Sequence, residues 1–207
     1  MKRLYAARKQ LFKVIQLPCL LITAIWSVSS VQAQTLELLQ GIQSASGVFE
    51  QIIREQDGYL VDRQSGTFVI DRPRRLRWEI NELDQLLVSD GSQLYFYDQL
   101  FQQVVVRDWS SNPALNPAAI LLDQVDLEDW AEVERVGNNY RLVPLKNFGS
   151  IQELNLTFSD EFPELLSLLD VTGQITEIHF SQVVLNKTNE DTLFEFVMPE
   201  GVEVLYE

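Results

Sequence analysis

Segments in which polar and apolar residues alternate, separated by short turn signals, dominate the sequence from Val48 onward. Alternation with a period of two is typical of half-buried strands, and the pairs Asp57-Gly58 and Asp90-Gly91 favour tight hairpins. An antiparallel sheet with so many strands must curl on itself. We therefore predict a mainly β (α+β) fold with about 10–11 antiparallel strands. Two finer predictions are a small insertion at Asp160–Ser167 and a last hairpin of Leu193–Val197 with Val202–Tyr206.

The stretch Gly66–Trp78 combines four arginines, one proline and several large apolar residues. Proline lacks a backbone donor and restricts the residue before it, so Arg72-Pro73 should end one strand before Arg75–Ile80 begins the next. Gly66 is a candidate for a bend or bulge. Apolar and charged side chains alternate along Arg75–Ile80, so one face of that strand is apolar and the other charged. The three arginines Arg74, Arg75 and Arg77 form either a solvated surface paired with acids or a functional basic patch.

Two segments carry a helical pattern instead. Thr35–Ser44 has apolar residues at helical spacing and a threonine that can cap it. Pro117–Leu122 follows Asn116, the arrangement of a cap before proline at the first helical position. A helix there can be a lid over the curled sheet or a plug that only stabilises one end of it. The interior can accordingly be a solid core or an apolar cavity.

The first 33 residues have the composition of a cleavable signal peptide. Basic residues without any acid precede an apolar core at Leu17–Val28, and Val31-Gln32-Ala33 has the form of a cleavage site. An uncleaved anchor is the alternative, although the apolar core is short for a membrane span. Cys19 lies within this segment, so we expect a cysteine-free domain over residues 34–207.

The predicted domain is strongly acidic. All 30 acidic residues follow residue 33, but only 11 of the 16 basic residues do, which leaves a formal charge of about −19. Such a charge repels nucleic acid and anionic membrane surfaces and favours a soluble monomer.

Side chains suited to catalysis or metal binding are sparse. The only histidine, His179, lies between Ile178 and Phe180 in a predicted strand, and the predicted domain has no cysteine nucleophile. A transition-metal site and a cofactor are therefore not expected, and no catalytic residue is assigned. A curled apolar sheet without such chemistry favours binding of an apolar molecule.

Several short segments, in order and at matching spacing, carry a family resemblance. They are Phe49-Glu50-Gln51, Gly66 to Pro73, Leu76-Arg77-Trp78, Val88 to Gly91, Leu94 to Asp98, Gln103-Val104, Pro117 with Leu121-Leu122, Asp170 with Gly173-Gln174, and Phe194 to Phe196 with Pro199 to Val204. In these segments the chain resembles the LolA family of periplasmic carriers for outer-membrane lipoproteins. The match departs at Ser44–Gly47, where further apolar residues are usual, and at the acidic residues 160–164.

The resemblance implies an unclosed antiparallel barrel with an N-terminal helix and a helical lid over an apolar cavity. It implies a Gram-negative periplasmic location, acyl chains of lipoproteins as cargo, an inner-membrane ABC transporter (LolCDE-like) as donor and an outer-membrane receptor (LolB-like) as acceptor. Arg72 matches the arginine that latches the lid by hydrogen bonds to backbone carbonyls. The acyl-chain cavity is assigned to Phe49, Phe68, Trp78, Leu87 and Leu121.

Three alternatives to this function stay open. One is a LolA-like periplasmic sensor or carrier for another lipid. A second is the lipid-anchored, receptor-like version of the fold. A third is a hydrolase that uses His179.

Overall fold

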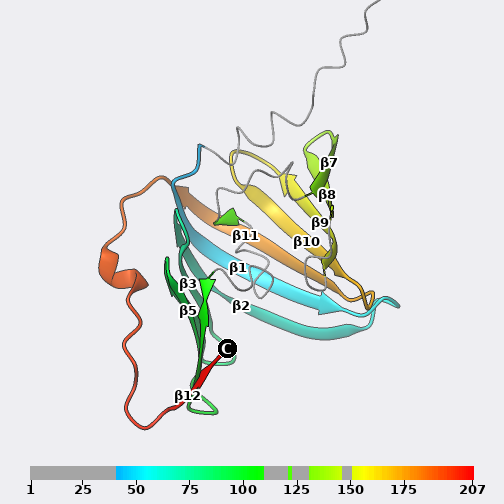
Figure 1. The fold of residues 1–207 in the computed structure, drawn as a ribbon. Helices are drawn as coiled ribbons and strands as arrows, with labels where there is room; N and C mark the ends of the chain where they lie inside the picture. Colours follow the sequence, from blue (N-terminus) through cyan, green and yellow to red (C-terminus); the bar gives the residue numbers. More distant parts are fainter. Residues whose placement is uncertain (1–40, 110–120, 123–130, 146–150) are drawn as a thin grey trace, which may run out of the picture.

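In the computed structural model, twelve strands of the described residues form a single sheet (Figure 1). The described residues are 41–109, 121–122, 131–145 and 151–207. The strands are β1 (Ser44–Arg54), β2 (Leu60–Asp71), β3 (Arg75–Ile80), β4 (Gln85–Asp90), β5 (Gln93–Asp98), β6 (Gln103–Asp108), β7 (Ala131–Val136), β8 (Asn139–Pro144), β9 (Ile151–Phe158), β10 (Pro163–Asp170), β11 (Ile175–Leu185) and β12 (Glu203–Tyr206).

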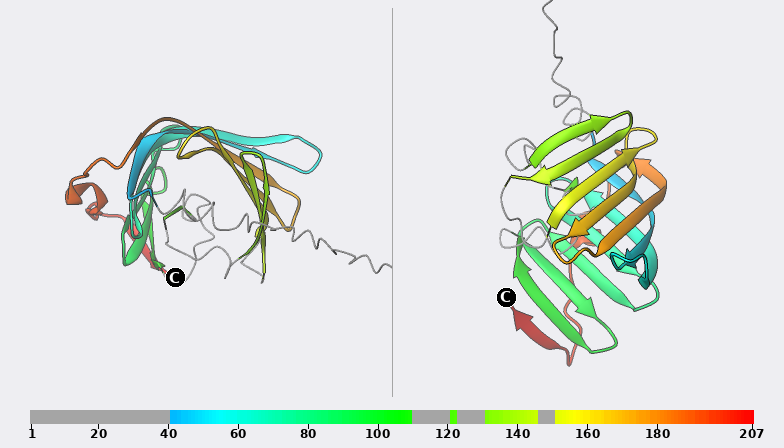
Figure 2. Two further views of the ribbon diagram at one scale, coloured as in Figure 1. Left: turned by 90° about the horizontal axis from the view of Figure 1, so that it is seen from above. Right: turned by 90° about the vertical axis from the view of Figure 1, so that its right-hand side faces the viewer.

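The sheet curves into an arch that does not close. Its strand order is β12-β6-β5-β4-β3-β2-β1-β11-β10-β9-β8-β7, so β12 and β7 form the two edges. Seen from above, β3 to β6 form one side of the arch, β1 and β2 its top, and β7 to β11 the other side (Figure 2). The predicted mainly β, unclosed antiparallel architecture is confirmed, with the exception that β12 runs parallel to β6.

The predicted helices are not found in the described part of the chain. No α-helix occurs within residues 41–109, 121–122, 131–145 and 151–207. Thr35–Ser44 was predicted to be helical to its end, but Ser44 already begins β1, because it pairs with Asp71 of β2. Of the predicted Pro117–Leu122 helix, the described Leu121 has 3-10 helical conformation and Leu122 lies in a turn. Residues 35–40 and 117–120 lie outside the described residues.

Two strand predictions were also wrong. The insertion at Asp160–Ser167 is only a tight connection, because β10 already begins at Pro163. The last hairpin does not form, because Asp191–Phe194 is the 3-10 helix η4 and the chain then reaches β12 beside β6.

Two cross-strand pairs of glycine and phenylalanine hold β1 against β2. Phe49 lies opposite Gly66, and Phe68 lies opposite Gly47. A Cβ on Gly66 would lie only 1.7 Å from the carbonyl oxygen of Glu79 and 2.7 Å from the Phe49 ring. Gly66 is therefore required for close packing, and register shifts occur instead in β1, between Ser46 and Val48 and between Ile53 and Arg54.

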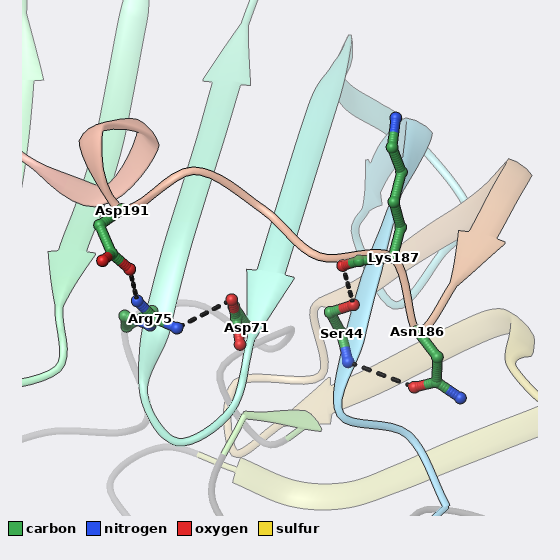
Figure 3. Close-up of polar contacts among 6 residues, drawn as sticks. All are labelled: Ser44, Asp71, Arg75, Asn186, Lys187 and Asp191. Atoms are coloured by element: carbon green, nitrogen blue, oxygen red, sulfur yellow. Dashed lines mark hydrogen bonds and ion pairs between the residues drawn. The ribbon is translucent and has the colours of Figure 1, made fainter.

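A C-terminal strap, residues 186–202, crosses the convex face of the arch on its way from β11 to β12 (Figures 1 and 2). Its start is fixed by Asn186, whose Oδ1 accepts a hydrogen bond of 2.8 Å from the backbone N–H of Gln43. The hydroxyl of Ser44 donates to the carbonyl of Lys187 at 2.7 Å (Figure 3).

Side chains of β3 and β5 hold the rest of the strap. Arg75 bridges Asp71 of β2 and Asp191 of the strap at 2.9 and 2.6 Å (Figure 3). The same guanidinium lies 5.0 Å from the centre of the Phe194 ring. Phe196 stacks on Tyr95 of β5 with ring centres 5.0 Å apart. The strap is therefore a packed part of the fold.

Candidate functional site

The concave face of β3 to β6 contains a pocket of about 420 Å³. This volume lies within the range of about 300–1,000 Å³ that is usual for small-molecule sites. Its wall is mostly apolar, with polar groups only from two glutamines and one arginine. The lining residues are Gln51, Trp78, Ile80, Gln85, Leu86, Leu87, Leu94, Phe96, Val105 and Arg107.

Strand register brings these side chains together. Trp78 of β3 lies opposite Leu87 of β4, Leu87 lies opposite Phe96 of β5, and Phe96 lies opposite Val105 of β6. Directly opposed residues of an antiparallel pair face the same side of the sheet. One row across four strands therefore forms the apolar floor of the pocket.

The five predicted cavity residues occupy different positions in the structure. Trp78 and Leu87 line the pocket. Phe49 and Phe68 belong to an aromatic cluster beside it, and Phe49 stacks on Trp78 with ring centres 3.9 Å apart. Leu121 is buried in the same core cluster. Their role in holding acyl chains stays a prediction.

The aromatic cluster fills the interior next to the pocket. Phe68 contacts Trp78, Phe162 and Phe180, at centre-to-centre distances of 5.9, 5.9 and 5.2 Å. Phe162 and Phe180 also meet edge to face at 5.3 Å. Aromatic rings thus occupy much of the interior under β1, β2, β10 and β11, and a more polar pocket of about 510 Å³ borders Phe162 and Phe180 at the β9–β10 connection. The apolar pocket lies under β3 to β6.

Arg72 reaches from the end of β2 to the segment that contains Leu121. It is 8% exposed, and its Nε and Nη2 donate to the carbonyl oxygen of Leu121 at 2.8 and 2.5 Å. Its backbone N–H donates to the carbonyl of Gln43 at 2.8 Å. Five donors in a fixed fork suit a guanidinium to this bridging contact. The contact matches the geometry expected of a latch, and whether it opens stays a prediction.

Two of the remaining arginines of Gly66–Trp78 lie on the convex face. Arg75 pairs with Asp71 and Asp191. Partial burial alone would lower its pKa, but hydrogen bonds and charge attraction from these carboxylates outweigh burial and raise the pKa. Arg77 pairs with Glu79 at 2.5 Å and donates to the carbonyl of Leu193 at 3.5 Å. The interpretation as a face paired with acids therefore fits both, and both also contact the strap.

Sequence reasoning did not assign Phe96, Val105 or Arg107 to the site. The alternation of polar and apolar residues could have indicated them, because it places them on the same inward face of the sheet as Trp78 and Leu87. What alternation does not reveal is which inward positions border free volume.

His179 lies exposed on β11, opposite Glu50 of β1 and Leu165 of β10. It faces away from the buried Ile178 and Phe180 on either side of it. This position is typical of a surface strand residue, and it lies on the face of the sheet opposite to the pocket lining.

A family profile described as outer membrane lipoprotein carrier protein LolA matches residues 40–197. The chain belongs to the LolA family. It is 31% identical over 191 residues to the outer-membrane lipoprotein carrier protein of Halorhodospira halophila, which covers 89% of this chain and 92% of that one. It is 32% identical to the protein of the same name from Chromohalobacter salexigens, over 86% of this chain and 90% of that one.

Solved structures agree on the fold. A LolA superfamily protein from Nitrosomonas europaea superposes with a TM-score of 0.50 at 12% identity, covering 81% of this chain and 99% of that one. An uncharacterised conserved protein from Thermus thermophilus superposes with a TM-score of 0.51, also at 12% identity, over 84% and 99%. The LolA-type sheet therefore persists at low sequence identity.

Within residues 41–109, 121–122, 131–145 and 151–207 no helix is long and apolar enough to cross a membrane. The predicted signal peptide at residues 1–33 lies outside these residues.

Proposed function

We propose that the protein is a periplasmic carrier that holds the acyl chains of lipoproteins and delivers them to the outer membrane. The observation that carries this proposal is the apolar pocket on the concave face of a LolA-family sheet, beside a side chain that fastens a buried segment. The similar proteins from Halorhodospira halophila and Chromohalobacter salexigens are named for the same role.

The physics of the cargo explains why such a pocket is needed. Each buried methylene contributes about 0.8 kcal/mol, so a lipid with several acyl chains does not cross an aqueous compartment unaided. A carrier must shield the chains and still release them. A few polar contacts suit that task, because each contributes only about 1 kcal/mol net and can be exchanged.

The two contacts from Arg72 to Leu121 are suited to this control. In the proposed cycle, they hold the Leu121 segment against the core until cargo or a partner replaces them. An inner-membrane ABC transporter supplies the lipoprotein and an outer-membrane receptor accepts it. The N-terminal residues 1–33 direct export and are removed.

The test is a reconstituted transfer assay with a triacylated lipoprotein. The wild-type protein should bind the lipoprotein in stoichiometric amounts and pass it to receptor-bearing membranes. Arg72→Leu should still fold, but transfer should fall about tenfold, the loss expected for one strong hydrogen bond to a charged donor. Arg74→Leu, two positions along at the exposed turn, is the matched control and should transfer normally.

Failure of the wild-type protein to bind any acylated protein would reject the carrier function. Unchanged transfer by Arg72→Leu would reject only the latch. Mass spectrometry of lipids that copurify from periplasm separates a lipoprotein carrier from a carrier or sensor of another lipid.

A further inference from the structure

One positively charged residue, Arg107, lies on the mostly apolar wall of the pocket. Arg107 lies opposite Leu94 in the β5–β6 pair and lines the pocket with Phe96 and Val105. It is the charged residue among the described residues that line the pocket. A charged group beside hydrocarbon is costly unless its donors are satisfied, so its position needs an explanation.

One part of the Arg107 side chain is already paired. Its Nη2 forms an ion pair with Glu207, whose backbone N–H donates to the carbonyl of Val106 at 3.1 Å. The side chain of Arg107 is 24% exposed and that of Glu207 is 52% exposed, so the pair lies at the border between pocket and solvent. The pair is formally neutral, and an added anion would compete with Glu207 for the guanidinium.

Another part of the side chain is left without a partner. The Nε–H of Arg107 is buried and makes no hydrogen bond to the described residues. Unsatisfied buried donors are rare and destabilising in folded proteins. A guanidinium has donors and no acceptor, so the missing partner must be an acceptor. A hydrocarbon chain offers none, whereas an acyl ester or amide offers a carbonyl oxygen.

We propose that Arg107 binds a carbonyl oxygen of an acyl ester or amide in the pocket, so that the pocket distinguishes acyl-linked chains from ether-linked ones. The inference rests on the proposed function, because it assumes that lipid enters this pocket. A neutral carbonyl oxygen fits better than a carboxylate or phosphate, since Glu207 already balances the charge. The same carbonyl chemistry occurs in an acylated cysteine and in a glycerolipid.

The test compares matched ester and ether ligands on the full-length chain. One pair is a dipalmitoyl-glyceryl cysteine peptide and its dihexadecyl ether analogue, and the second pair is dipalmitoylglycerol and its diether. Displacement of a fluorescent fatty-alcohol probe gives each affinity. Wild type should prefer the ester about fivefold in at least one pair, the effect of one hydrogen bond, and that pair identifies the source of the ligand. Arg107→Met should reduce the ratio to about one with little change for the ether.

Two further variants separate recognition from a structural role. Glu207→Gln should raise the affinity for palmitate several-fold, because the guanidinium then lacks its counter-charge. Arg63→Met, on the outer face of β2, removes an arginine elsewhere and should leave every affinity unchanged. If Arg107 only anchors β12, Arg107→Met weakens ester and ether alike and their ratio stays constant, which overturns the inference. Equal wild-type affinities for ester and ether overturn it as well, whereas binding of neither ligand rejects the proposed function itself.

Discussion

Two regions of the sheet differ in how fully their concave faces are filled. Under β1, β2, β10 and β11 the concave face is filled by Phe49, Phe68, Phe162 and Phe180. The convex face there is more exposed, as His179 illustrates. We call this the packed side.

Under β3 to β6 the concave face is only partly filled, and we call this the hollow side. The concave face borders the pocket, while the convex face buries Val88, Val104 and Val106 beneath a strap that adds the buried Phe194. These four residues lie outside the main core cluster. The comparison teaches that a sheet can leave its inner face partly vacant if its outer face is covered.

The largest expected effect contrasts equivalent aromatic truncations on the two sides. Phe68→Ala removes a fully buried ring with three aromatic neighbours and should lower the free energy of unfolding by about 4 kcal/mol. Phe96→Ala removes a half-buried ring that faces the pocket, and should cost about 1 kcal/mol. Urea denaturation followed by circular dichroism measures both.

The two substitutions should rank in the opposite order by their direct effect on lipid affinity. Phe96→Ala should weaken binding of an acyl ligand, whereas any effect of Phe68→Ala should come from lost stability. Equal destabilisation by the two substitutions would contradict the distinction between a packed and a hollow side.

A second prediction concerns close packing on the packed side. Gly66→Ala places a methyl group against the Glu79 carbonyl and the Phe49 ring and should destabilise the fold by about 3 kcal/mol. The neighbouring Thr67 is exposed, so Thr67→Ala should change stability by less than about 0.5 kcal/mol. A mild effect of Gly66→Ala, measured from the shift of the urea midpoint, would mean that β2 and β3 can move apart.

A third prediction concerns the outer support of the hollow side. Phe196→Ala removes the ring stacked on Tyr95 and should loosen the strap at a cost of about 1–2 kcal/mol. Hydrogen exchange should then accelerate in the strap and β12, while β1, β2 and β11 keep their protection. Uniform acceleration over the whole sheet would show that the strap is not a separate support.

The smallest expected effect is a pH dependence in the β10–β11 turn. Burial alone would raise the pKa of the Asp170 carboxyl, but hydrogen bonds from Thr172 and Gln174 outweigh it and lower the pKa below its usual value. A folded-state pKa below the unfolded one stabilises the fold above about pH 4, and the contribution is lost as the pH falls through the folded-state pKa.

Asp170→Asn should therefore cost about 0.5 kcal/mol near neutral pH and become neutral in acid. Urea midpoints measured from pH 7 down to pH 3 give this difference. Asp160→Asn, in the β9–β10 connection, controls for the loss of one negative charge. A difference that persists undiminished at pH 3 would contradict the assignment.

Local alternation and turn chemistry predicted most of the sheet. The strand Arg75–Ile80, for example, was predicted with the observed bounds. Leu193–Val197 failed as a strand because its first two residues belong to the 3-10 helix η4 and the segment lies on side chains of the sheet. Phe194 and Phe196 have the same alternation as a strand, although they pack on side chains. Hydrogen-bond partners are a tertiary property that periodicity does not reveal.

For the candidate site, the sequence pointed to Arg72 but not to the position of the free volume. The proline after Arg72 and the family resemblance pointed to Arg72, which makes the contact with Leu121. Phe49 and Phe68 were assigned to the cavity because they are large, apolar and inward, yet their rings fill the interior between strands. Free volume depends on how side chains from distant strands mesh, so its position could not be derived from single strands.

The strap has a consequence for the resting protein. A sheet that is supported on its convex face does not have to collapse when a ligand leaves the pocket on its concave face. Because η4 with its buried Phe194 packs against β3 and β4 from the convex face, this support does not depend on what the pocket contains. The strap can therefore support the pocket wall whether or not a ligand is bound.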